Sequence, residues 1–94
     1  MSVGLLTLHL HLPGCTSLKE KRSRLKPLLA RLQREFNVSV AEMGRQDAWR
    51  ETVIACAMVS SDANQTHRAL QDVARWVESS WPDLELTGHQ LELL

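Results

Sequence analysis

The stretch VGLLTLHLHLPGCTSLKE, residues 3–20 of this 94-residue chain, decides the fold because it joins a strand to a helix. Leucines stand at every second position from 6 to 12, and a mixed set of side chains alternates with them: Val3, Leu5, Thr7, His9 and His11. This period of two predicts a strand with one wholly apolar face. Pro13-Gly14 ends the strand, and Ser17 followed three residues later by Glu20 is typical of a capped helix start.

The helix that begins after Ser17 is expected to reach about Phe36. Its apolar residues fall on one stripe at about 100° per residue: Leu18, Leu25, Leu28, Leu29, Leu32 and Phe36. Pro27 lies opposite this stripe, where water can bind the carbonyl group that the proline leaves without a donor. We therefore expect a kink at Pro27 and not a break.

The rest of the chain supplies three more strands and one more helix. We expect strands at Val38–Met43 and Trp49–Val59, a helix between the cap candidates Ser60–Asp62 and the segment Trp81–Asp83, and a last strand at Leu84–Leu94. Residues 44–47 are turn formers, so the first two of these strands should pair as a hairpin. Gly88 is expected to bend the last strand.

The resulting order is βαββαβ, and right-handed crossovers leave few ways to arrange it. The sequence favours an α+β, ferredoxin-like sandwich that occupies residues 1–94 as a single domain. Its four-stranded antiparallel sheet should have the order 4-1-3-2, with both helices on one face.

Composition narrows the class of protein. Eleven basic and eleven acidic residues give a net charge of zero, which excludes a generally basic nucleic-acid binder. Two cysteines, Cys15 and Cys56, are too few for a secreted disulfide scaffold and indicate free thiols in a reducing compartment. The N-terminal segment lacks the features of a signal peptide, and no apolar run reaches the roughly 18 residues that span a membrane. We therefore expect a cytoplasmic protein without membrane association.

The strand at Trp49–Val59 is apolar on both faces. One set of alternating residues is Val53, Ala55, Ala57 and Val59, and the other is Ile54, Cys56 and Met58. A central strand of this kind needs cover on both faces, and the chain is too short to supply it. We expect a homodimer, with this interface on the open face: Val3, Leu5, His9, His11, Ile54, Cys56 and Met58. The alternative is a monomer whose small side chains leave only a modest exposed patch.

The zero net charge hides two opposed segments. Residues 17–36 hold seven basic and two acidic residues, whereas residues 77–94 hold four acidic residues and no lysine or arginine. Cations in the first turns of a helix oppose its dipole, and a broken local rule often marks a functional site. We expect an anion or RNA contact there, made by Ser17, Lys19, Lys21, Arg22, Arg24 and Lys26. The alternative is a solvated helix face.

Catalytic and metal-binding patterns are weak in this sequence. His9 and His11 project from the same strand face, but a zinc site needs three or four ligands, so no metal, cofactor or catalytic residue is predicted. An enzyme that uses His9, His11 and Glu42 remains an alternative. Trp49 is expected to cover one end of the core, and Trp76 should be partly exposed because it lies off its helix's apolar stripe.

Several of these segments together resemble one family. His11-Leu12-Pro13-Gly14, the run Ser17–Arg22, the run Phe36–Glu42, and then Gly44, Gln46-Asp47 and Trp49 are similar to the motifs of the YlxP-like proteins, domain-of-unknown-function family 503. The resemblance spans essentially the whole chain. It implies a small bacterial protein with the ferredoxin-like fold and brings no known catalytic activity.

The family resemblance also bears on function, because its members are often encoded beside translation-initiation and ribosome-maturation genes. This context implies a role near RNA or the ribosome. Our leading hypothesis is a non-enzymatic module that binds RNA through the basic first helix. The alternatives are a homodimeric protein-interaction or scaffolding module that uses its open sheet face, and a metal- or ligand-dependent enzyme.

Overall fold

A computed structural model describes residues 1–45 and 47–94, and its elements follow the predicted order. They are β1 (Ser2–His11), α1 (Leu18–Glu35), β2 (Ser39–Gly44), β3 (Glu51–Ser60), α2 (Ala63–Ser80) and β4 (Glu85–Leu93). The predicted bounds agree within one or two residues, and α1 continues through Pro27 without a break. Gln46, expected in the turn between β2 and β3, lies outside the described residues.

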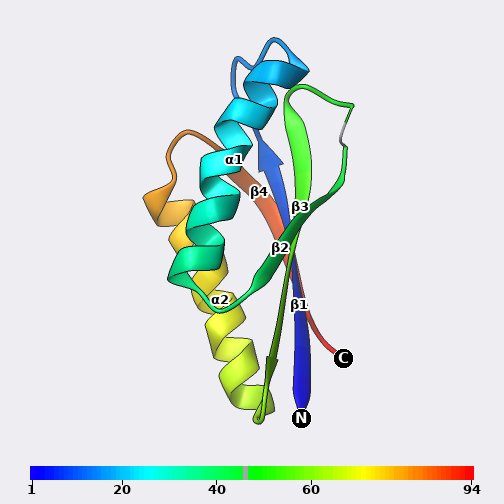
Figure 1. Cartoon of the computed structure of the whole chain (residues 1–94), viewed down its shortest axis with the longest axis vertical. Helices are drawn as coiled ribbons and strands as arrows, with labels where there is room; N and C mark the ends of the chain where they lie inside the picture. The colour runs from blue at the N-terminus through cyan, green and yellow to red at the C-terminus, as the bar shows by residue number, and fades with distance from the viewer. Residues whose placement is uncertain (46) are drawn as a thin grey trace.

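The sheet confirms the ferredoxin-like α+β arrangement. Its strand order is β2-β3-β1-β4, and every neighbouring pair is antiparallel. Figure 1 shows α1 and α2 on the same side of this sheet, with the other side open. The two longest strands, β1 and β3, lie at the centre of the sheet. Central strands are covered by the helices more completely than edge strands, and β1 and β3 carry the apolar residues that this cover requires. Neither helix of the described chain is long and apolar enough to cross a membrane.

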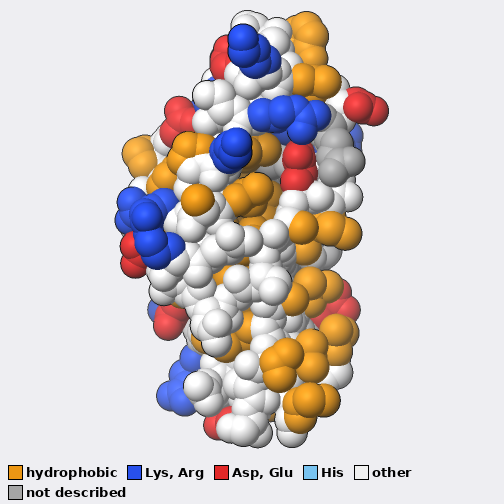
Figure 2. All heavy atoms as spheres, in the orientation of Figure 1, with side chains coloured by type: hydrophobic (Ala, Val, Ile, Leu, Met, Phe, Trp, Pro, Cys, Tyr) orange, Lys and Arg blue, Asp and Glu red, His pale blue; other side chains and the backbone are white. Residues whose placement is uncertain are grey.

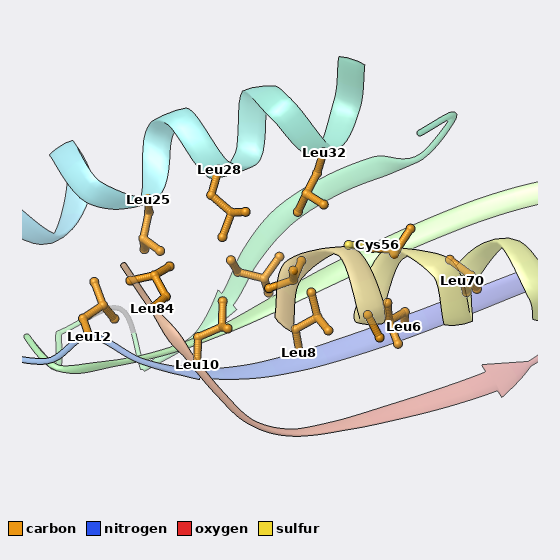
Figure 3. Packing of buried hydrophobic residues seen from close by; sticks show 14 of the residues in the cluster. Leu6, Leu8, Leu10, Leu12, Leu25, Leu28, Leu32, Cys56, Leu70 and Leu84 are labelled. Atoms are coloured by element: carbon orange, nitrogen blue, oxygen red, sulfur yellow. The ribbon is translucent and has the colours of Figure 1, made fainter. Parts of the chain in front are cut away.

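The core lies between the sheet and the helices. The alternating leucines of β1 point from the sheet toward leucines of α1 and α2, as Figure 3 shows: Leu6, Leu8, Leu10, Leu12, Leu25, Leu28, Leu32 and Leu70. Each of these side chains is almost completely removed from water, which stabilises the fold by about 2 kcal/mol per leucine. The predicted apolar face of β1 is therefore the face that the helices cover.

The phase of β3 corrects one prediction. Leu8 pairs with Ile54 and Leu6 pairs with Cys56, so Ile54 and Cys56 face the helices and are fully buried. Met58 shares that face, opposite Gly4. These three residues are not on the open face, where we expected them. The open face of β3 carries the other set instead: Val53, Ala55, Ala57 and Val59.

Both edges of the sheet contain an irregularity. On β4, Gly88 pairs with His9 and Leu86 pairs with Leu10, which leaves Thr87 as an extra residue. The hydroxyl of Thr87 donates to the carbonyl oxygen of His9 at 3.1 Å. Such bulges bend an edge strand and hinder pairing with another sheet, and this one lies beside the position where Gly88 was expected to bend the strand.

Candidate functional site

Lys21 is a buried structural residue and not a contact for an external anion. Only 1% of it is exposed. Its Nζ donates to the carbonyl oxygens of Arg45 at 2.6 Å and Ala48 at 2.7 Å, and it lies 3.1 Å from the Oε2 of Glu42. The prediction that Lys21 meets a phosphate is therefore wrong. The burial of Lys21 could have been predicted from the sequence, because Lys21 precedes Leu25 by four residues and Leu28 by seven and therefore lies on the apolar stripe of the helix.

Glu42 completes this buried cluster from the helix side of the sheet. Its carboxylate accepts a hydrogen bond from the Oγ1 of Thr52 at 2.7 Å in addition to pairing with Lys21. Because Glu42 pairs with Ile54 in the sheet, it faces the helices, whereas His9 and His11 face the open side. The structure therefore does not bring together His9, His11 and Glu42, the residues of the enzymatic alternative.

The cysteines and histidines form no chemical centre in the described part of the chain. No group of three or more His, Cys, Asp or Glu side chains gathers there in a way that fits a metal ion. Burial raises the pKa of the Cys56 thiol to about 12, so that this group stays protonated and unreactive. Cys15 is also buried, and its thiol donates to the carbonyl oxygen of Ser17 at 3.4 Å.

Ser17 and Arg24 are also engaged within the fold. The Oγ of Ser17 accepts from the backbone N–H of Glu20 at 3.0 Å, which caps α1. The guanidinium of Arg24 donates to Asp83 Oδ2 at 2.9 Å and to the carbonyl oxygen of Pro13 at 2.8 Å. This hydrogen bond to the carboxylate of Asp83 raises the pKa of Arg24 above its ordinary value. Arg24 thus ties α1 to the segments that precede α1 and β4.

Three of the predicted contact residues remain free. Lys19, Arg22 and Lys26 are exposed and form no ion pair or side-chain hydrogen bond with another described residue. Their spacing of three and four residues places them on one face of α1. Figure 2 shows lysine and arginine side chains along the surface where α1 runs in Figure 1. Of the six predicted contact residues, these three cations are thus the ones that the fold leaves available.

An aromatic residue that was expected in the core, Trp49, lies in the segment between β2 and β3. Trp49 is 50% exposed, so the expectation that it covers one end of the core is wrong. Trp76 is partly buried, as expected, and its ring lies 5.8 Å from the ring of Phe36 and 5.8 Å from that of Trp81. The aromatic contacts beside the core are therefore made by Phe36, Trp76 and Trp81, whereas Trp49 lies at the surface.

The open sheet face is apolar at its centre. Four of the seven predicted interface residues lie on it and are half-buried: Val3, Leu5, His9 and His11. Ala55 and Ala57 lie between them and β2, and Val59, at the end of β3, is 61% exposed. Figure 2 shows hydrophobic side chains along the side of the molecule away from the helices. No helix of the described chain covers this face.

Comparisons with known proteins match almost the whole chain. A family model described as a protein of unknown function (DUF503) matches residues 3–91. The uncharacterized protein YlxP of Bacillus subtilis (strain 168) is 48% identical over 71 residues, which are 76% of this chain and 76% of that protein. The de novo designed protein Foldit4 superposes with a TM-score of 0.53 and 16% identity, over 100% of this chain and 97% of that chain. The similarity to Foldit4 concerns the fold alone.

Proposed function

The chain belongs to the DUF503 family of bacterial proteins of unknown function, and from this premise we propose that it is a non-enzymatic module that binds RNA through α1. One observation carries the proposal. Of the five lysine and arginine side chains without an ion pair or hydrogen bond to another described residue, four lie on α1: Lys19, Arg22, Lys26 and Arg34. Cations that the fold does not use are available to backbone phosphates.

The arrangement of these cations favours contact with phosphates over the reading of bases. Lys19, Arg22 and Lys26 extend along one face of α1, and long flexible side chains on a convex surface position a nucleic-acid backbone. If the three cations neutralise three phosphates, the affinity for single-stranded RNA should fall about twentyfold when the salt concentration rises fourfold. The zero net charge of the whole chain is compatible with this, because the cations gather on one helix.

Replacing Arg22 with glutamate is expected to lower the affinity for RNA about tenfold, because it removes one phosphate contact and adds a repulsive charge. The matched control is Arg68→Glu on α2, which makes the same charge change at an exposed residue with no ion pair in the described chain. Fluorescence anisotropy of a labelled 12-nucleotide RNA at low and moderate salt measures both. Equal affinity of the two variants would contradict the proposal.

We also propose that the open sheet face binds a second copy of this chain. The specific observation is the area of that face. The four strands hold 10, 6, 10 and 9 residues, which at about 3.3 Å per residue and about 4.8 Å per strand cover roughly 550 Å². Two such faces bury about 1,100 Å², slightly above the roughly 1,000 Å² expected of a biological interface. The small side chains of Ala55 and Ala57 leave the centre flat, which suits packing of one sheet on another.

Replacing Ala57 with glutamate is expected to convert the dimer to a monomer, because it would bury a carboxylate without a partner at the centre of the interface. Sedimentation velocity from about 1 to 200 μM measures the oligomeric state. Ala30→Glu, an exposed position of α1 on the opposite side of the molecule, is the control and should leave the dimer intact. A wild-type protein that stays monomeric at 200 μM would rule out this second function.

A further inference from the structure

We infer that Trp49 is a stacking platform for an unpaired base, and that the RNA bound by this protein is therefore single-stranded where it passes the β2–β3 segment. The inference rests on the proposed RNA binding through α1 and names its substrate class. The inference starts from two observations that are combined at Trp49. Its large side chain is half exposed, whereas the backbone before and after it is held by hydrogen bonds.

The first restraint on this backbone comes from α1. The ammonium group of Lys21 binds the carbonyl oxygens of Arg45 and Ala48, and Ala48 directly precedes Trp49. The backbone N–H of Ala48 also donates to the carbonyl oxygen of Arg45 at 3.1 Å. These contacts hold Arg45 and Ala48 together and against α1, so the backbone of Trp49 is set relative to Lys19 and Arg22, the exposed cations near Lys21.

The second restraint follows Trp49 in the chain. The carbonyl oxygen of Arg50 accepts from the backbone N–H of Leu12 at 2.8 Å, and the Nε of Arg50 donates to the carbonyl oxygen of Cys15 at 3.1 Å. The indole is thus attached to a backbone fixed to α1, to the end of β1 and to the segment before α1. A side chain on a backbone that is fixed before binding loses less conformational entropy when a ligand stacks on it than one on a free loop.

The surroundings of Trp49 fit a base better than a phosphate. The indole borders an open cavity of about 610 Å³ lined by His11, Asp47, Ala48, Trp49, Arg50 and Glu51. Asp47 offers an acceptor for the amino group of a base, whereas Glu51 is paired with Arg45 at 3.5 Å. Carboxylates repel phosphates but accept hydrogen bonds from base edges. We therefore expect the phosphates to contact the cations of α1 and the base to stack on the indole.

Figure 1 places the two parts of this surface at one end of the molecule, where α1 begins and β2 connects to β3. A strand that follows the exposed cations of α1 reaches this end after only a few nucleotides, because α1 is 18 residues long. A base in the interior of a duplex is stacked on both faces and cannot meet an indole without leaving the helix, so the aromatic contact favours unpaired RNA.

The test compares Trp49→Ala with the wild type on two probes, a 12-nucleotide single strand of cytidines, whose bases carry an amino group, and a 12-base-pair RNA duplex. Loss of stacking is expected to weaken single-strand binding about tenfold and to leave duplex binding unchanged. Trp49→Phe, which keeps an aromatic ring, should remain within about threefold of the wild type on both probes. Met43→Ala, an exposed apolar residue of β2, is the control for loss of surface.

The outcomes separate this inference from the proposal on which it rests. If Trp49→Ala binds the single strand as well as the wild type does, or loses affinity equally for both probes, the stacking role is overturned while binding through α1 stands. If the wild type binds neither probe, both are overturned. A Trp49→Ala protein with an unchanged urea midpoint and a selective loss of single-strand binding supports the inference.

Discussion

Replacing Lys21 with methionine is expected to lower the free energy of unfolding by about 3 kcal/mol, the lower part of the range for breaking a buried charge pair. Methionine fills a similar volume but has no donor. The carbonyl oxygens of Arg45 and Ala48 lose their hydrogen bonds, and the carboxylate of Glu42 loses its cation in a site where 19% of its side chain is exposed. Urea unfolding followed by circular dichroism measures the change.

The matched control is Lys19→Met, two residues earlier on the same helix. Lys19 is exposed and has no ion pair in the described chain, so this substitution should change the stability by less than about 0.5 kcal/mol. A double variant, Lys21→Met with Glu42→Gln, also removes the negative charge that Lys21 balances and should be more stable than Lys21→Met alone. If Lys21→Met matched the control, the buried cluster would have no structural role.

The fold followed from the sequence where local signals and periodicity agreed. The alternating leucines of β1 and the cap at Ser17 each specify one element and one orientation, and both are present in the structure. The phase of β3 did not follow, because a strand with apolar residues on both faces carries no signal for the side that faces the helices. Only its pairing with β1, residue by residue, places Ile54 in the core and Val53 outside.

The candidate site was predicted less well, because residue type was given more weight than residue position. Lys21 was grouped with the other cations although it lies on the apolar stripe of α1. Trp49 was assigned to the core because large aromatic residues usually lie there. Its exposure follows from contacts between residues far apart in the chain, from Lys21 and Cys15 to the β2–β3 segment, which no local pattern contains.

Replacing Gly4 with alanine is expected to destabilise the protein by about 2 kcal/mol, the middle of the range for overpacking a core. Gly4 lies in β1, on the face that the helices cover, beneath the start of α2. A Cβ at this position would come within 2.7 Å of the Cδ1 of Leu70 and closer still to the Cγ2 of Thr66. Urea unfolding gives the size of the loss. Gly88→Ala, in β4 with no atom within 4 Å of the added Cβ, is the control and should be nearly neutral.

The cost at Gly4 depends on Thr66 more than on Leu70. Leu70 can change rotamer, whereas Thr66 is held by hydrogen bonds of its Oγ1 with Ser60 at 2.6 Å and with the carbonyl oxygen of Asp62 at 3.3 Å. Thr66→Ser keeps these hydrogen bonds and removes the clashing methyl group. Gly4→Ala should therefore cost less than about 1 kcal/mol in a Thr66→Ser background. An undiminished cost there would show that β1 and α2 are held apart by something other than this single contact.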